Sequence, residues 1–317
     1  MSDNIVDQPF QVPNIGNTCY ISSLLFGLYF NPSIDDYMLN QDVSDVNAIY
    51  LQEVINQHFV QKIRNFKSVQ ESTMEQIRYF CRELGWKTNP VEQIYAQQDV
   101  SEFYMFLLEN LSGVQIKYQS ETITENAIKS SDDVGEETDI PYIPLALPMD
   151  PNIKSVKVKD MLDSWLSDNV KEVNRKVKNE YGEIEEKLVN ALDIKYITNI
   201  PPILPVCINR FQNIIDEKGD FKIVKNETHV IIQKKISPFK NVNNLNRREW
   251  HFHAAICHRG SSPNSGHYYC LVRDSNNCFY IFDDLKPKCL RRVCMDDREV
   301  TDMLKKECFL VLYNFKV

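Results

Sequence analysis

The chain lacks several features that would quickly assign it to a class of protein. Its nine cysteines are scattered, and no two of them form a C-x-x-C pair. No apolar run approaches the roughly eighteen residues that a membrane-spanning helix needs. The first segment, MSDNIVDQPF, is polar and has no apolar core of the kind found in secretory signals. We therefore expect free thiols in a reducing compartment and a soluble intracellular protein, cytoplasmic or nuclear.

Basic residues are also fewer than acidic residues. With 36 lysines and arginines against 44 aspartates and glutamates, the formal net charge is −8. Phosphate backbones are bound by clustered lysine and arginine, so we expect no nucleic-acid partner, and the lack of an apolar span predicts no membrane association. The hydrophobic share of 43% and the charged share of 25% are typical of a globular protein.

The N-terminal third is predicted to be helical. Residues 14–18 (NIGNT) have the composition of a turn, and Thr18 is placed to cap a helix. Apolar side chains then recur with helical spacing at Ile21, Leu24, Leu25 and Leu28. Pro32 predicts that this helix ends near residue 31. Similar patterns predict further helices within 45–84 and over 99–111.

Strands are predicted to dominate the C-terminal part. Residues 119–140 are polar and acidic and predict an exposed loop, and 158–168 predict a short helix. The densely charged stretch 171–190 is compatible with a long helix or a hairpin. From residue 203 onward, short β-rich runs such as ILPVCINRF and CFLVLYNF follow one another. Helices first and strands later predict an α+β protein with an antiparallel sheet.

Cys19 is the candidate nucleophile. It would occupy the first turn of the helix that follows Thr18, where partial positive charge and unpaired N–H groups favour a thiolate. The same N–H groups can hold the oxyanion of a tetrahedral intermediate. A buried structural cysteine is the commoner fate of this residue type, and the position of Cys19 alone would favour that alternative.

His267 is the candidate general base. It stands beside Gly266 at the start of the β-rich run HYYCLVRD, where an imidazole can be both exposed and firmly aimed. The next β-rich run ends in Asp283 and Asp284. If the two runs pair as a hairpin through residues 275–277, an aspartate lies beside His267 and can orient its ring. The pattern therefore allows a Cys–His–Asp triad.

Five segments that occur in a fixed order carry a family resemblance. They are PNIGNTCYISSLL, AQQDVSEFYMFLLENL, IPPILPVCINRF, the stretch from HFHAAICH to CFYIFDD, and CFLVLYNF. Together they resemble the boxes of ubiquitin-specific proteases, the papain-like deubiquitinases, over about residues 10–315. The resemblance implies a thiol-dependent hydrolase that acts on ubiquitin and ubiquitinated proteins, with a protease for a ubiquitin-like modifier as the alternative.

The resemblance also implies roles for individual residues. Cys19 would attack the isopeptide carbonyl, and His267 would accept its proton and later protonate the leaving lysine amine. Asp283 would orient His267, with Asp284 as the second candidate. Asn14 would be the side-chain donor of the oxyanion hole. The residues expected to contact the tail of ubiquitin are Gln98, Asp99, Phe211, Gly266 and Tyr268.

Some of these tail residues have simpler explanations. Asp99 is placed to cap a helix, with Glu102 reaching back as in a capping box, although a capping carboxylate can keep one oxygen for a ligand. Phe211 is an isolated aromatic in a strand, and such residues more often belong to the core. Gly266 and Tyr268 resemble the residues that form a narrow passage in the family, and this passage admits only a Gly-Gly tail.

The implied fold is a single catalytic domain over residues 1–317. It would comprise a helical thumb (about 10–111), reduced fingers with linking segments (about 112–200) and a β-rich palm (about 201–317). Many members of the family hold a zinc ribbon of two C-x-x-C pairs in the fingers, whereas residues 112–200 contain no cysteine and no histidine. We therefore expect no metal and no cofactor, and fingers that are held by strand pairing or are much reduced.

Three further departures from the family pattern are small. Ser22 and Phe26 replace residues that are usually polar and are expected to affect packing mainly. Ser265 replaces the first glycine of the usual Gly-Gly-His and could stiffen the loop over the tail.

Other histidines suggest a metal only weakly. His251, His253 and Cys257 would share one face of a strand, but donors along one strand do not make a tetrahedral cage. His258 lies where the family often has a histidine without a catalytic role. Two rival functions are a general papain-like peptidase with an open groove and a non-catalytic scaffold that binds ubiquitin.

Overall fold

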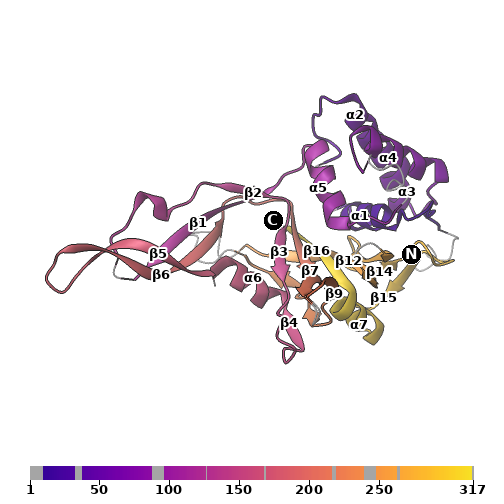
Figure 1. The fold of residues 1–317 in the computed structure, drawn as a ribbon. Helices are drawn as coiled ribbons and strands as arrows, with labels where there is room; N and C mark the ends of the chain where they lie inside the picture. Colours follow the sequence, from indigo (N-terminus) through magenta and orange to yellow (C-terminus); the bar gives the residue numbers. More distant parts are fainter. Residues whose placement is uncertain are drawn as a thin grey trace.

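The computed structural model describes residues 10–32, 38–87, 96–125, 127–167, 169–215, 219–238, 248–262 and 265–315. It contains a group of N-terminal helices, a large central sheet and a second sheet that projects away from both (Figure 1). This arrangement confirms the predicted α+β class. Within the described ranges, no helix is long and apolar enough to cross a membrane.

The helical part begins with α1, which is mostly apolar and all of whose residues are buried, Ser22 and Ser23 included. The end of α1 at Tyr29 confirms the boundary predicted before Pro32. Thr18 occupies the N-cap position, but its side chain makes no capping hydrogen bond and accepts one from Ile15 N instead (3.1 Å), so the predicted cap is wrong. The helices are α1 (Cys19–Tyr29), α2 (Val46–Glu53), a π-helical segment (Val54–Val60), α3 (Gln61–Arg64), α4 (Glu71–Glu83) and α5 (Val100–Asn110).

The central sheet has the strand order β15-β14-β13-β12-β16-β7-β3, and β11 adds to β12. All its pairs are antiparallel except β3 with β7, which confirms the predicted antiparallel sheet with one exception. The strands are β3 (Ile143–Ala146), β7 (Ile203–Asn209), β11 (Lys235–Ile236), β12 (Trp250–Ser262), β13 (Ser265–Arg273), β14 (Phe279–Phe282), β15 (Leu290–Val293) and β16 (Cys308–Phe315).

Each face of the central sheet has its own hydrophobic core. On one face, α1 packs with Phe26 stacked on Phe282 of β14 at a ring-centroid distance of 4.2 Å. The other face packs against α6 (Val158–Ser167) and α7 (Arg298–Glu307). Neighbouring residues of β13 alternate between the two cores, as strand geometry requires: Tyr268 belongs to the first and Tyr269 to the second.

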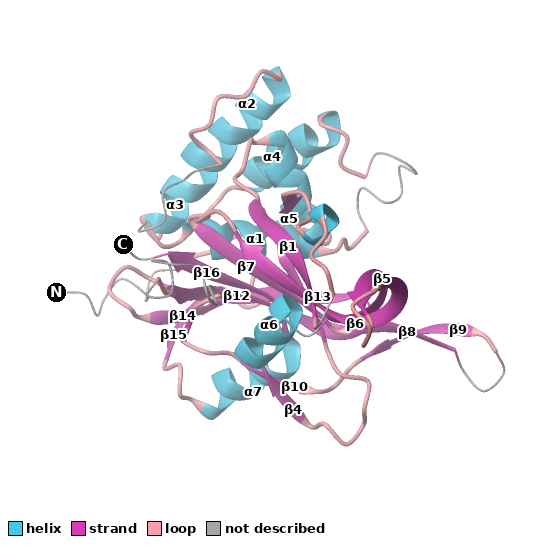
Figure 2. Ribbon diagram, turned by 90° about the vertical axis from the view of Figure 1, so that its left-hand side faces the viewer, coloured by secondary structure: helices cyan, strands magenta, loops and turns pink. Residues whose placement is uncertain are grey.

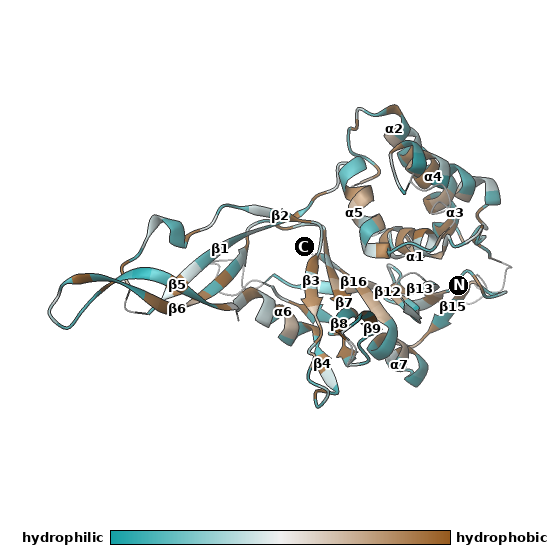
Figure 3. Ribbon diagram, in the orientation of Figure 1, coloured by the Kyte–Doolittle hydropathy of each residue, from teal (hydrophilic) through white to brown (hydrophobic). Residues whose placement is uncertain are grey.

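The projecting sheet corrects one prediction and decides another. Its order is β2-β1-β6-β5, and β5 pairs along its whole length with residues 184–193 of β6, so residues 171–190 form a hairpin and not a helix. The loop predicted over 119–140 is wrong at its two ends, where β1 pairs with β6 as far as Thr124 and β2 pairs with β1, so that strand partners satisfy the backbone of these polar residues. Between them, residues 127–137 lie outside the strands, as predicted, and include one 3-10 turn (Ser131–Asp133). Figure 3 shows mixed hydropathy along β5 and β6. The strands are β1 (Ile116–Thr124), β2 (Thr138–Ile140), β5 (Asn169–Lys178) and β6 (Ile184–Ile197).

Two small strand pairs complete the described fold. β4 (Ser155–Lys157) pairs in parallel with β10 (His229–Ile231). β8 (Phe211–Ile215) and β9 (Phe221–Lys225) form a separate hairpin that extends from the body in Figure 2. At the base of this hairpin Arg210 is buried and donates to four backbone carbonyls, which ties β8 to the end of α7. This anchoring fixes the position of Phe211 at the start of β8.

Candidate active site

Cys19 lies at the N-terminus of α1, where the sequence predicts it. The preceding turn is tight, since Gly16 and Asn17 both have positive φ (77° and 55°). Asn14 Oδ1 accepts a hydrogen bond from Thr18 N (3.2 Å) and closes that turn. Cys19 is 2% exposed, and the backbone N–H of Tyr268 donates to its Sγ at 3.5 Å. The thiol therefore lies at the contact between α1 and β13.

The predicted hairpin brings His267 and Asp283 together. In the β13–β14 ladder Cys270 is opposite Phe282, so the residues that precede Cys270 and follow Phe282 meet at one end. His267 Nε2 lies 2.7 Å from Asp283 Oδ1 and 3.9 Å from Asp284 Oδ1. Asp283 is thus the closer partner of the imidazole.

The electrostatics of this group favour a charged imidazole. Burial by itself would lower the pKa of His267, but hydrogen bonds with Asp283 and Cys19 outweigh it and raise the pKa to about 9. Burial likewise would raise the pKa of Asp283, but the hydrogen bond and charge of His267, together with the hydrogen bond from Leu285 N, outweigh burial and lower the pKa. A protonated imidazole between a carboxylate and a thiol is the state in which a thiolate nucleophile is stabilised.

Asp284 has a different set of contacts from Asp283. Its side chain is fully buried, accepts a 2.7 Å hydrogen bond from Ser22 Oγ and a 3.3 Å hydrogen bond from Asn14 Nδ2. Burial raises the pKa of Asp284 above its usual range. Ser22, expected to affect packing mainly, is instead part of the polar network at the start of α1. The expectation for Phe26 is confirmed by its stacking on Phe282.

Gly266 stands where a side chain has no room. Its φ is +146°, and a Cβ would lie 2.7 Å from His258 Nε2 and still closer to the carbonyl oxygen of Arg259. His258 in turn accepts a hydrogen bond from Gln97 Nε2 (2.9 Å). Burial, with Lys225 nearby, lowers the pKa of His258 to about 4, so its ring is neutral and can accept that bond at pH 7.

Sequence reasoning missed Gln97. Of the two adjacent glutamines it favoured Gln98, whereas the structure buries Gln97 against His258 and leaves Gln98 partly exposed. Because both residues are glutamines, the sequence contains no signal that shows which of them is buried. Phe211 meets the same His258 edge to face, with ring centroids 5.7 Å apart, and it also packs against the first hydrophobic core.

The remaining tail candidates are also close to this region. Asp99 is the N-cap of α5 and accepts from Ser101 N (2.6 Å) and Glu102 N (3.3 Å), which confirms the predicted cap. Glu102 does not reach back but pairs with Lys87 at 2.6 Å, so the predicted capping box is wrong. Tyr268 is fully buried, and the group that it presents to Cys19 is its backbone N–H.

The weak metal candidate does not assemble. A bulge in β12 opposite β16 at Phe252–Ala254 breaks the period-two alternation. His253 is buried near Gly27 and Leu28 of α1, while Cys257 belongs to the core on the opposite face, so the predicted shared face is wrong. Among the described residues, the one group of three potential metal donors is His267, Asp283 and Asp284, in which His267 and Asp283 are already hydrogen-bonded to each other.

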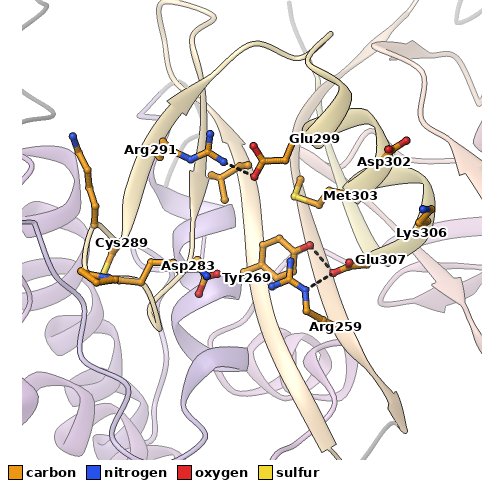
Figure 4. Close-up of a pocket in the computed structure, with 14 residues that line it drawn as sticks. Arg259, Tyr269, Asp283, Cys289, Arg291, Glu299, Asp302, Met303, Lys306 and Glu307 are labelled. Carbon is orange, nitrogen blue, oxygen red and sulfur yellow. Dashed lines mark hydrogen bonds and ion pairs between the residues drawn. The ribbon is translucent and has the colours of Figure 1, made fainter.

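A cavity of about 840 Å³ adjoins the triad, and Asp283 forms part of its wall (Figure 4). On the same wall, Tyr269 OH donates to Glu307 Oε2 (2.6 Å), and Arg259 Nε pairs with the same oxygen at 3.2 Å. The Arg259 guanidinium also lies 4.7 Å from the centroid of the Tyr269 ring. These contacts fasten β12 and β13 to α7 beside His267, so the strand that carries the imidazole is held firmly.

The fold and the site together define a class of protein. A cysteine at a helix N-terminus, next to an imidazole that is in turn hydrogen-bonded to a carboxylate, is the arrangement of a thiol-dependent hydrolase of the papain-like type. The protein-family model described as ubiquitin carboxyl-terminal hydrolase matches residues 11–307. The chain therefore belongs to the ubiquitin carboxyl-terminal hydrolase family, which confirms the resemblance.

Comparisons with individual proteins agree. The chain is 23% identical over 330 residues to mouse ubiquitin carboxyl-terminal hydrolase 17-like protein B, covering 95% of this chain and 62% of that protein. It is 24% identical over 305 residues to Arabidopsis ubiquitin carboxyl-terminal hydrolase 25, covering 87% of this chain and 44% of that protein. The chain thus spans less than two thirds of the length of these curated relatives.

A solved structure shows the same fold. It is the SAGA Ubp8/Sgf11/Sus1/Sgf73 DUB module bound to ubiquitin aldehyde, with a TM-score of 0.67 and 15% identity. The match covers 97% of this chain and 70% of that chain. The α+β architecture of this chain is therefore that of the ubiquitin-specific protease catalytic domain.

Proposed function

We propose that this protein is a cysteine deubiquitinase that hydrolyses the isopeptide or peptide bond after the C-terminal glycine of ubiquitin. The observation that carries the proposal is the position of His267, which bonds Asp283 at 2.7 Å and interacts with Cys19, in a chain of the ubiquitin carboxyl-terminal hydrolase family. Cys19, His267 and Asp283 are the groups that we assign to catalysis. Asp284 is the second candidate for the third position.

In the proposed reaction the Cys19 thiolate attacks the carbonyl carbon and forms a tetrahedral intermediate. Its oxyanion is held by N–H groups at the start of α1 and by Asn14, whose amide nitrogen carries two hydrogens and uses one on Asp284. Collapse expels the lysine amine, which takes a proton from His267. Water, deprotonated by His267, then hydrolyses the thioester and releases ubiquitin with a free carboxylate.

The surroundings of Gly266 support a narrow passage for the substrate tail. The crowding of Gly266 by His258 and Arg259 and the burial of Cys19 leave little room for side chains near the scissile bond. A Gly-Gly tail satisfies that constraint, and a general peptide does not. We assign Gln98, Asp99, Phe211, Gly266 and Tyr268 to tail contact, and Gln97 joins them by supporting His258.

We assign ubiquitin and ubiquitinated proteins as partners, because the SAGA DUB module of the same fold is bound to ubiquitin aldehyde. In this assignment about 10–111 form the thumb, 112–200 the fingers and 201–317 the palm. The projecting sheet β2-β1-β6-β5 would be the fingers, held by strand pairing and containing none of the cysteines of a zinc ribbon. The substrates of the protein would be ubiquitin conjugates in the cytoplasm or nucleus.

Two assays test the proposal. Cleavage of a ubiquitin-derived fluorogenic amide is expected to exceed cleavage of a short Gly-Gly amide by orders of magnitude, and equal efficiency would indicate a general peptidase. A ubiquitin with an electrophilic C-terminus should label the protein through Cys19, and labelling retained in Cys19→Ala would exclude Cys19 as the nucleophile. The same probe built on ubiquitin-like modifiers decides which modifier is held.

A third variant separates catalysis from binding. His267→Ala is expected to stop turnover and to leave ubiquitin binding nearly intact, since the tail contacts remain. Binding without turnover in the wild-type chain would instead identify a scaffold. Loss of binding and turnover together in the variant would assign His267 a folding role.

A further inference from the structure

One end of the β14–β15 pair has two cysteines that the proposed reaction does not use, Cys278 before β14 and Cys294 after β15. In their antiparallel ladder Phe279 is opposite Val293. Continuing this register by one residue places Cys278 opposite Cys294. Both thiols are free, Cys278 is partly exposed and Cys294 is exposed. The fold thus brings two accessible cysteines into one cross-strand position.

The hydrogen-bond pattern shows which kind of cross-strand pair they form. Asp283 N donates to Cys289 O at 2.8 Å, and hydrogen-bonded pairs alternate with non-hydrogen-bonded pairs along the ladder. If Asp283 and Cys289 form a hydrogen-bonded pair, so do Ile281 with Arg291 and Phe279 with Val293. The next position, Cys278 with Cys294, is then a non-hydrogen-bonded pair. The backbone of Cys278 agrees, because its N–H and C=O both bond to Asp274 on the β13 side. Cα atoms in such pairs lie about 4.5 Å apart, within the range of about 4.4–6.8 Å that a disulfide spans.

The two sulfur atoms also belong to one face of the sheet. Cys278 packs against the same core as Tyr280 and Phe282, the alternate residues of its strand. Cys278 Sγ accepts a 3.1 Å hydrogen bond from Arg292 Nη2, so the sulfur and the side chain of Arg292 in β15 lie on the same face. Arg292 precedes Cys294 by two residues and therefore shares its face.

We propose that Cys278 and Cys294 form a reversible disulfide that staples β14 to β15, with a small disulfide such as oxidised glutathione as the oxidant. The exposed Cys294 thiolate attacks one sulfur of the oxidant, forms a mixed disulfide and releases one glutathione thiol. The Cys278 thiolate then attacks Sγ of Cys294 and releases the second glutathione thiol. Two protein thiols are oxidised, one glutathione disulfide is reduced, and the two protons end on the released thiols.

The staple would act on the strands that present the catalytic aspartates. β15 is an edge strand of four residues, and edge elements are among the first to open. β14 leads directly into Asp283 and Asp284. Cross-linking closes a loop of fifteen intervening residues, 279–293, and restricts the unfolded chain. The oxidised form should therefore hold this corner of the site to a higher temperature.

The test uses the full chain carrying Cys19→Ser, so that the nucleophile does not react and the outcome is independent of deubiquitinase activity. After incubation with oxidised glutathione, intact mass should fall by two hydrogen atoms, and peptide mapping should join Cys278 to Cys294. The unfolding midpoint should rise by about 5 °C and return on reduction. Cys278→Ser should instead carry one glutathione on Cys294.

Three results would overturn the proposal. One is a stable glutathione adduct on Cys294 while Cys278 remains free, since this would show that the sulfurs cannot meet. Another is pairing of either cysteine with a different thiol. The third is formation of the expected cross-link with no rise in the unfolding midpoint, because the bond would then not act as a staple.

Discussion

Replacing Asp283 by asparagine removes the charge beside His267 while keeping the shape of the side chain. In the wild-type protein the 2.7 Å contact with Asp283 and the interaction with Cys19 raise the pKa of His267 from 6.5 to about 9. Without the carboxylate the imidazolium loses the first of these supports. Its pKa should fall from about 9 towards 6.5, with Cys19 retaining part of the difference.

The expected consequence is a large loss of rate with a changed pH dependence. Removal of the orienting carboxylate from such a triad costs on the order of 10²–10⁴ in kcat. The assay is kcat/KM for a ubiquitin-derived fluorogenic amide between pH 6 and 10, since that profile reports the pKa values of the free enzyme. The alkaline limb should lie near pH 9 in the wild type and move to lower pH in Asp283→Asn.

Stability should follow the same group. Because the pKa of His267 is raised in the folded state, the protonated ring stabilises the fold fully below about pH 6.5 and loses this effect as the pH rises through about 9. Urea unfolding should therefore show a wild-type stability that declines across this window. The decline should be smaller in Asp283→Asn.

Asp284→Asn is the matched comparison, since Asp284 lies 3.9 Å from His267 and bonds to Ser22 and Asn14 instead. We expect this variant to lower the rate through Asn14 and to leave the alkaline limb in place. If Asp283→Asn kept its rate within tenfold and its alkaline limb, while Asp284→Asn lost both, Asp284 and not Asp283 would be the orienting residue.

Three further substitutions test the surrounding structure. Gly266→Ala should lower kcat/KM at least about 10²-fold by displacing the strand that carries the imidazole, whereas Gly182→Ala, also at positive φ but with open space around it, should keep full activity. Ser22→Ala should lower the free energy of unfolding by about 1–3 kcal/mol, measured in urea, because buried Asp284 loses a 2.7 Å donor; an unchanged value would show that water replaces the hydroxyl. Phe26→Ala should cost about 3–5 kcal/mol by emptying the space against Phe282, and a loss below 1 kcal/mol would contradict the stacked packing.

Local pattern was sufficient for much of the fold and for the proposed pairing of His267 with Asp283. The helical spacing of Ile21, Leu24, Leu25 and Leu28 predicts α1, because such a spacing places apolar side chains together on one face of a helix. The link between His267 and Asp283 was predictable because it depends on one short hairpin, whose register is a local property. The resemblance to ubiquitin-specific proteases then added Asn14 and the tail residues to the predicted site.

Long-range pairing explains most of the errors. The polar segment 119–140 contains strands because β6, some seventy residues later, satisfies the backbone of β1. His253 and Cys257 face opposite cores because a bulge against β16 breaks the alternation. The sequences of these segments contain no signal that reveals the partner strand or the bulge.

The amino-acid sequence by itself therefore determined the chemical groups, their family and the elements that carry them. Only the tertiary structure decided which groups touch: that Asp283 is nearer His267 than Asp284, that Ser22 holds Asp284, and that Gln97 and not Gln98 supports His258. The physical reason is range. Helical period and hairpin register act within about twenty residues and bring both aspartates near His267. The contacts of Ser22 with Asp284 and of Gln97 with His258 depend instead on how α1 and the 96–99 segment pack against the central sheet.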